Sequence, residues 1–130
     1  MMAPEWLNEV VADFGRQMGL NGFALNERGT AGVRFENGIT FRLEYANEAL
    51  MMIVGFIPTN AEDFQSFAAK LLTVAHYEAA GSKGIRVGFL KRSGEAIATA
   101  RISERELDVP KMEEKFGLIW QTAMETGAGR

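Results

Sequence analysis

The sequence predicts an α+β fold, in which helices pack on a twisted antiparallel sheet. Two kinds of hydrophobic periodicity indicate this class. In three segments apolar residues recur at three- and four-residue steps, as in amphipathic helices. In the stretches between them apolar and polar residues alternate, as in half-buried strands. The expected order along residues 1–130 is helix, three strands, helix, two strands, helix, forming one domain.

The first helix is expected from Pro4 to Met18. Pro4 suits the first turn, where a backbone N–H has no partner within the helix. Glu5 is favoured at the positive end of the helix dipole, and Gly19 suits the residue that follows the last turn. The apolar stripe comprises Leu7, Val10, Val11, Phe14 and Met18.

A three-stranded meander is expected between Ala31 and Ile57. Its first connection could be a two-residue loop at Asn37-Gly38, but that loop would set charged residues opposite apolar ones. A three-residue loop ending at Gly38 instead pairs Phe35 with Ile39 and Val33 with Phe41. Because register follows the buried face, we expect the longer loop, with Gly38 in the left-handed conformation.

The third strand, Leu50 to Ile57, is apolar on both faces. One face carries Leu50, Met52, Val54 and Phe56, and the other carries Met51, Ile53 and Ile57. Such a strand needs two covers. The domain's own core is one of them, and the second is either a helix or a partner.

The second half of the chain predicts a helix, two strands and a last helix. Thr59 and Glu62 form a capping box before a broad apolar helix that runs from Ala61 to about Ala80. Strands follow around residues 85–89 and 96–102, and Asp108 caps the last helix. One face of the fifth strand carries only small residues near its start (Ala96, Ala98, Ala100), which leaves room for a helix of this or another chain.

Composition excludes several classes of function. The net charge is −3, and an acidic surface disfavours nucleic acids and anionic membranes. The absence of cysteine excludes disulfides and thiolate metal sites, and the single histidine, His76, excludes a multi-histidine site within one chain. No apolar run approaches the ~20 residues of a membrane span and no secretory signal is visible, so we expect a cytoplasmic protein.

The sequence offers no catalytic constellation. A nucleophile needs a base within reach, and His76, beside Tyr77, is interpreted as a structural residue. The carboxylates lie on turns and solvated faces, including Glu9 and Asp13 one helical turn apart. We therefore expect no catalytic residue, no metal and no cofactor. What remains is surplus apolar surface, which is typical of partner sites: Met51, Ile53, Ile57, Leu72, Val74 and Tyr77.

Several segments resemble one family. They are Phe14-Gly15-Arg16-Gln17-Met18-Gly19-Leu20, Leu25-Asn26-Glu27-Arg28-Gly29, Val33-Arg34-Phe35 and Phe41-Arg42-Leu43-Glu44. Together with the order of elements they resemble the class I type III secretion chaperones, the small acidic proteins related to the Tir chaperone CesT. Asn26 stands where an aspartate is common in that family.

The resemblance implies a homodimer without enzymatic activity that has a role in virulence. Such proteins bind the N-terminal segment of a secreted effector, which stays extended and adds a strand to a chaperone sheet. Cargo would then bind near Phe35, Phe41, Leu43, Met51 and Ile53. The dimer contact would lie near Phe67, Leu71, Val74, Val87 and Phe89.

Two alternatives remain open at this point. A YbjN-like or other protein of the same fold would act as an adaptor or regulator that binds a cytoplasmic partner. A small-molecule binder or minor enzyme would require an enclosed pocket with convergent polar groups.

Overall fold

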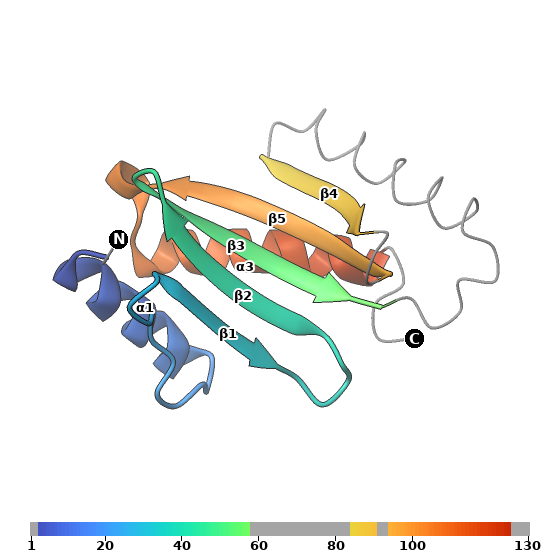
Figure 1. The fold of residues 1–130 in the computed structure, drawn as a ribbon, viewed down its shortest axis with the longest axis horizontal. Coiled ribbons are helices and arrows are strands. Elements are labelled where there is room, and N and C mark those ends of the chain that lie inside the picture. The colour runs from blue at the N-terminus through green and yellow to red at the C-terminus, as the bar shows by residue number, and fades with distance from the viewer. Residues whose placement is uncertain (1–2, 58–83, 91–93, 126–130) are drawn as a thin grey trace.

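A computed structural model describes residues 3–57, 84–90 and 94–125 and confirms the α+β class with an antiparallel sheet (Figure 1). Its elements are α1 (Glu5–Gln17), β1 (Thr30–Arg34), β2 (Thr40–Ala46), β3 (Ala49–Phe56), β4 (Ile85–Leu90), β5 (Glu95–Ser103), the short 3-10 helix η1 (Glu104–Glu106) and α3 (Val109–Glu125). The helix expected from Ala61 to Ala80 and its capping box lie outside the described residues.

The five strands form one sheet in the order β1-β2-β3-β5-β4, and every neighbouring pair is antiparallel. β3 is therefore the central strand, while β1 and β4 are the edges. In Figure 1, α3 lies behind β3 and β5, and α1 lies beside β1. We call the side of the sheet turned away from α3 the outer face. It carries Thr30, Gly32, Arg34, Thr40, Arg42, Glu44, Ala46, Ala49, Met51, Ile53, Gly55, Arg86, Gly88, Leu90, Glu95, Ile97, Thr99, Arg101 and Ser103.

Phe41 is the centre of the core between the sheet and the two helices. Its side chain is fully buried, and its ring lies 5.9 Å from those of Phe14 and Phe23 and 4.8 Å from that of Phe116. These rings come from α1, the loop after it and α3, so one strand residue joins three other segments. Offset and edge-to-face ring pairs of this kind add roughly 0.5–1.5 kcal/mol each beyond the area they bury.

The hairpin between β1 and β2 has the predicted three-residue loop. Val33 pairs with Phe41, and the Phe35 N–H donates to the Ile39 carbonyl at 2.8 Å. The Gly38 N–H donates to the Phe35 carbonyl at 2.9 Å, and Gly38 has a φ of 85°. This left-handed conformation costs glycine little and would strain a residue that has a Cβ. The register argument from the buried face is confirmed.

The turn between β2 and β3 uses two residues with positive φ, Asn47 at 53° and Glu48 at 58°. Two left-handed residues suit a tight hairpin because their twist matches that of the strands. The Glu104 N–H donates to the Glu48 carbonyl at 3.0 Å, and the Tyr45 hydroxyl donates to Glu104 Oε1 at 2.7 Å. This hydrogen bond to a carboxylate favours the neutral phenol and raises the pKa of Tyr45. η1 thus anchors a turn that contains a left-handed glutamate.

β3 is covered differently on its two faces. Leu50, Met52 and Val54 have no exposed surface and face α1 and α3. On the outer face Met51 is half-buried and Ile53 is only 8% exposed. Ile57, just after the strand, is 59% exposed. The predicted two-sided burial is therefore confirmed for most of the strand.

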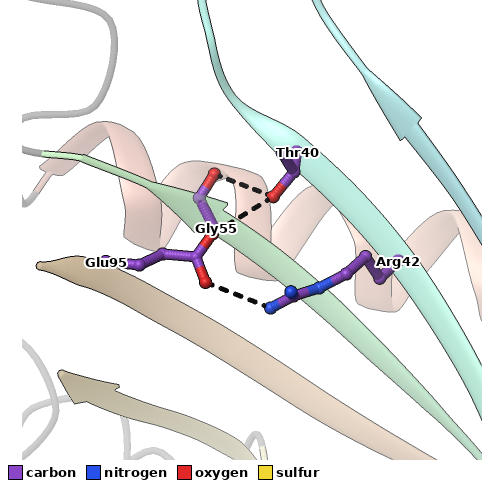
Figure 2. Close-up of polar contacts among 4 residues, drawn as sticks. All are labelled: Thr40, Arg42, Gly55 and Glu95. Carbon is purple, nitrogen blue, oxygen red and sulfur yellow. Dashed lines mark hydrogen bonds and ion pairs between the residues drawn. The ribbon is translucent and has the colours of Figure 1, made fainter. Parts of the chain in front are cut away.

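A polar clasp crosses β3 on the outer face (Figure 2). Glu95, from β5, accepts a hydrogen bond from Arg42 Nη2 at 3.3 Å and one from Thr40 Oγ1 at 3.5 Å, both from β2. The clasp passes over Gly55, where a Cβ would lie 2.5 Å from Glu95 Oε2. Glycine at position 55 thus creates the space that the Glu95 carboxylate occupies.

The small residues of β5 face the last helix of the same chain. Ala96, Ala98 and Ala100 are at most 2% exposed, and α3 packs against β5 and β3. Of the two covers considered for this face, the helix of this chain is the one observed. Alanine lets the helix approach closely, which leaves little room for a larger side chain.

Replacing Ala98 with leucine should lower the free energy of unfolding by about 1–3 kcal/mol, because the added atoms have no space beneath α3. Thr99→Leu is the matched control, since Thr99 is the next residue on the same strand and points to the outer face. It should change stability by less than about 1 kcal/mol. Urea unfolding followed by circular dichroism measures both, and equal losses would contradict this packing.

Gly55→Ala should destabilise the fold by about 1–2 kcal/mol, since the new methyl group displaces the Glu95 carboxylate from Thr40 and Arg42. Gly32→Ala is the control, because a Cβ there would meet its nearest neighbours at 3.7 Å. It should be neutral or slightly stabilising. In a Glu95→Ala background the cost of Gly55→Ala should shrink, and an unchanged cost in urea titrations would rule out the clasp as its cause.

Candidate partner-binding surfaces

An apolar groove of about 610 Å³ opens where α3, the β1–β2 hairpin and the residue after α1 meet. Its lining comprises Met18, Phe35, Glu36, Asn37, Phe116 and Trp120. Glu36 and Asn37 belong to the hairpin loop, so the conformation that Gly38 permits also places the polar part of this lining. The groove can therefore accept an apolar side chain or a short apolar segment.

The aromatic wall of the groove is continuous with the core. The Phe35 and Trp120 rings lie 5.6 Å apart at 86°, in edge-to-face geometry. Trp120 stacks on Phe116 at the same distance, and Phe116 contacts the buried Phe41 at 4.8 Å. Because each ring is held by the next, the groove is a preformed site whose shape depends on core packing.

The five residues predicted to bind cargo lie on three different parts of the structure. Phe35 is half-buried and lines the groove. Phe41 and Leu43 are fully buried on the face that α1 and α3 cover. Met51 and Ile53 lie on the outer face. The alternation along the strands predicts these facings, but it cannot say which face the helices leave uncovered.

Burial decides which of these residues have surface to offer. Phe41 and Leu43 are 0% exposed, so they support the groove from behind and do not line it. Ile53 is nearly buried directly opposite Arg42, whereas Met51 keeps part of its surface. Phe35 and Met51 are therefore the predicted residues that have accessible side chains.

Trp120 is the main groove residue that sequence reasoning missed. Its spacing in the last helix places it in the apolar stripe with Phe116 and Ile119, and a stripe residue is expected in the core. The structure buries Ile119 completely and leaves Trp120 half-exposed beside the hairpin. The difference in exposure between Ile119 and Trp120 depends on where the hairpin packs, and the periodicity of a helix does not predict that position.

The residues predicted for the dimer contact are only partly described. Phe67, Leu71 and Val74 lie outside the described residues, while Val87 and Phe89 lie on β4, an edge strand. Both are half-buried and pack against the core from the face that α3 covers.

β1 presents a short free edge. The Phe35 N–H and the Gly29 carbonyl form backbone hydrogen bonds with the chain of β2 and its flanking residue Ile39. Because backbone groups alternate in direction along a strand, the N–H and C=O groups of residues 30, 32 and 34 point away from β2. The Thr30 N–H donates to Asn26 Oδ1 at 3.0 Å, and the Thr30 carbonyl accepts a hydrogen bond from the Asn26 N–H at 2.8 Å. Within the described part of the chain, no backbone hydrogen bond reaches the outward groups of Gly32 and Arg34. Such an edge can pair with an added strand.

Among residues 3–57, 84–90 and 94–125 no group of three or more His, Cys, Asp and Glu side chains is arranged to hold a metal ion. None of the described helices combines the length and apolarity that a membrane crossing needs. His76 lies outside the described part of the chain.

Known proteins of similar structure have the same fold. The chain is similar to a structure titled "Crystal Structure of the ExsC-ExsE Complex", with a TM-score of 0.76, 19% identity and coverage of 95% of this chain and 92% of that one. It is also similar to a structure of the HopA1-SchA chaperone-effector complex, with a TM-score of 0.64, 23% identity and coverage of 87% and 86%. YbjN from E. coli, titled a putative transcription regulator, has a TM-score of 0.62, 8% identity and coverage of 91% and 86%.

At these identities the structural likenesses establish the fold alone. No curated protein sequence matches the chain. A family model, that of the Tir chaperone protein (CesT) family, matches residues 9–125, which include every described strand, all of α3 and the part of α1 from residue 9 onwards. The protein therefore belongs to the Tir chaperone protein (CesT) family.

Proposed function

We propose that this protein is a non-enzymatic cytoplasmic chaperone that binds the N-terminal segment of a type III secreted effector and keeps it non-globular and secretion-competent. The observation that carries the proposal is the family match across residues 9–125. The apolar groove at Phe35 and Trp120 supports it, because it provides a preformed site for a peptide.

In this proposal the effector segment uses the free edge of β1 and the groove together. An extended segment would pair with the outward backbone groups of Gly32 and Arg34, and Asn26 would end the pairing at Thr30. Side chains alternate along a strand, so every second residue of the segment would turn towards the side of the sheet on which Phe35 and Trp120 lie. Backbone pairing would supply affinity, and the groove would select apolar side chains.

The proposal also includes a single domain across residues 1–130 and a homodimer. The edge position of β4 supports a dimer contact near Val87 and Phe89, since an unpaired sheet edge is a natural site of association. Leu90, the next residue of β4, lies on the outer face opposite Glu95; it adds apolar surface to the same edge strand and is 42% exposed.

A same-fold adaptor or regulator is the second candidate, and the likeness to YbjN favours it. Binding of a cytoplasmic regulator, with no secreted protein captured, would support this candidate over the first. The family match gives the chaperone the stronger support.

Phe35→Asp should weaken effector binding at least tenfold, because it places a charge in the apolar groove and removes the ring beside Trp120. The measurement is co-purification with the protein encoded by the neighbouring gene, followed by titration calorimetry with its N-terminal segment. Phe35→Ala is a milder second variant that should act in the same direction.

Trp6→Asp is the matched control for the groove. Trp6 is an exposed aromatic near the other end of α1 from Met18, roughly 18 Å away along the helix axis. It should leave binding unchanged. If Phe35→Asp keeps its circular dichroism spectrum and also keeps wild-type affinity, the groove is not the effector site.

Light scattering of the free protein should give a mass near twice 14.3 kDa at micromolar concentration. Leu90→Asp should shift this equilibrium towards monomer, since it places a charge at the proposed contact. Trp6→Asp again serves as the control. A strict monomer at these concentrations would remove the dimer from the proposal.

A further inference from the structure

The sequence contains two Asn-Gly pairs, Asn21-Gly22 and Asn37-Gly38, and both lie in described loops. An asparagine before glycine is prone to spontaneous deamidation, because glycine has no Cβ to hinder the attack of its backbone nitrogen on the preceding side chain. Both asparagines are exposed, and both glycines have positive φ, 74° at Gly22 and 85° at Gly38. Neither the sequence nor exposure therefore distinguishes the two pairs.

The hairpin between β1 and β2 holds the second pair in an unreactive arrangement. The Gly38 N–H donates to the Phe35 carbonyl at 2.9 Å. The Ile39 N–H donates to Asn37 Oδ1 at 3.1 Å. The Gly38 nitrogen must lose its proton before it can attack, and the Asn37 amide carbon must turn towards it, so both hydrogen bonds have to open first. The loop that places Asn37 in the groove thus also protects it.

The first pair, in the loop after α1, has no such protection. Within the part of the chain that the structure describes, neither the Gly22 N–H nor the Asn21 side chain forms a hydrogen bond. The Gly22 nitrogen can therefore lose its proton and approach the Asn21 amide carbon without the loss of a protein hydrogen bond. This difference in hydrogen bonding makes Asn21 the reactive asparagine of the two.

We propose that Asn21-Gly22 is a site of spontaneous deamidation, which converts Asn21 to aspartate and isoaspartate, while the folded hairpin protects Asn37. The deprotonated Gly22 nitrogen bonds to Asn21 Cγ, the bond from Cγ to the amide nitrogen breaks, and ammonia leaves with a proton from water. Water then opens the resulting succinimide. Attack at Cγ gives aspartate, whereas attack at the main-chain carbonyl carbon gives isoaspartate, whose main chain runs through Cβ and Cγ. The net reaction consumes water, releases ammonia and oxidises nothing.

The reactive pair lies between two anchors of the core. On one side the Leu20 N–H donates to the Gly15 carbonyl at 2.7 Å. On the other side Phe23 is only 8% exposed, and its ring stacks on that of Phe41 at 5.9 Å. The Phe23 Cβ packs so closely on Gly15 that a Cβ added there would lie 2.7 Å from it. Isoaspartate lengthens the main chain between these anchors and adds a charge, so it displaces Phe23 from the close-packed core.

The test is an incubation of the full chain for several weeks in mildly alkaline buffer at physiological temperature. Trypsin, which cleaves after lysine and arginine, then releases residues 17–28 and 35–42 as separate peptides with one Asn-Gly pair each. Mass spectrometry measures the loss of each amide. An isoaspartyl methyltransferase with labelled S-adenosylmethionine measures isoaspartate in each peptide.

In the folded protein Asn21 should deamidate about tenfold or more faster than Asn37, because two hydrogen bonds must open at Asn37. In chain unfolded by guanidinium chloride the two rates should become similar, since the hairpin that protects Asn37 is then absent. Equal rates at the two pairs in the folded protein, or a faster reaction at Asn37, would overturn the assignment of the reactive site.

Asn21→Gln removes the reactive side chain and keeps an amide, because glutamine forms the corresponding larger ring far more slowly. It should abolish isoaspartate in residues 17–28, whereas the matched variant Asn37→Gln should leave that signal unchanged. After incubation the wild type should unfold at a lower urea concentration than fresh protein, and Asn21→Gln should keep its midpoint. Fresh Asn21→Asp adds the charge without lengthening the main chain, and it should keep the midpoint of fresh wild type.

An unchanged urea midpoint in wild type that has formed isoaspartate at position 21 would overturn the link to the Phe23 anchor. A midpoint lowered equally in fresh Asn21→Asp would assign the loss to charge and contradict the lengthened main chain as its cause. The inference does not depend on the proposed function, since effector binding is measured with fresh protein and deamidation is measured without an effector. The two can therefore fail separately.

Discussion

The packing of Phe41 is the interaction on which the rest of the structure depends. Its ring is fully buried and touches rings from α1, the following loop and α3. Through Phe116 it also supports Trp120 and hence the groove. Protein interiors are close-packed, so a change at this ring would be felt at the surface site as well as in the core. Stability and partner binding are coupled here through a chain of aromatic contacts.

The central strand β3 is apolar on both faces, and the two faces are covered by different kinds of group. On one face α3 lies close to β5 because Ala96, Ala98 and Ala100 are small. On the other face there is no described helix, and Glu95 and Arg42 reach over β3 instead. Gly55 makes that possible, since any larger residue would occupy the carboxylate's place. On this face Ile53 is only 8% exposed and lies directly opposite Arg42.

The groove and the β1 edge are both consequences of one hairpin. Its loop, completed by Gly38, carries Glu36 and Asn37 to the groove, and its first strand is the unpaired edge of the sheet. The two features lie beside each other because Phe35, the residue after β1, packs against Trp120 of α3 in the groove. A single extended segment could therefore contact both.

The sequence by itself determined the order of the described elements, the register of the first hairpin and the two-sided burial of most of β3. These follow from local periodicity and from the rule that register keeps apolar residues on one face. The tertiary structure alone decided which apolar residues reach the surface. Phe41 and Leu43 were predicted to bind cargo, yet both are buried under two helices. Trp120 belongs to the apolar stripe of the last helix, which predicts a core position, yet it lines the groove. Alternation assigns a residue to a face, but exposure depends on which segments distant in sequence cover that face.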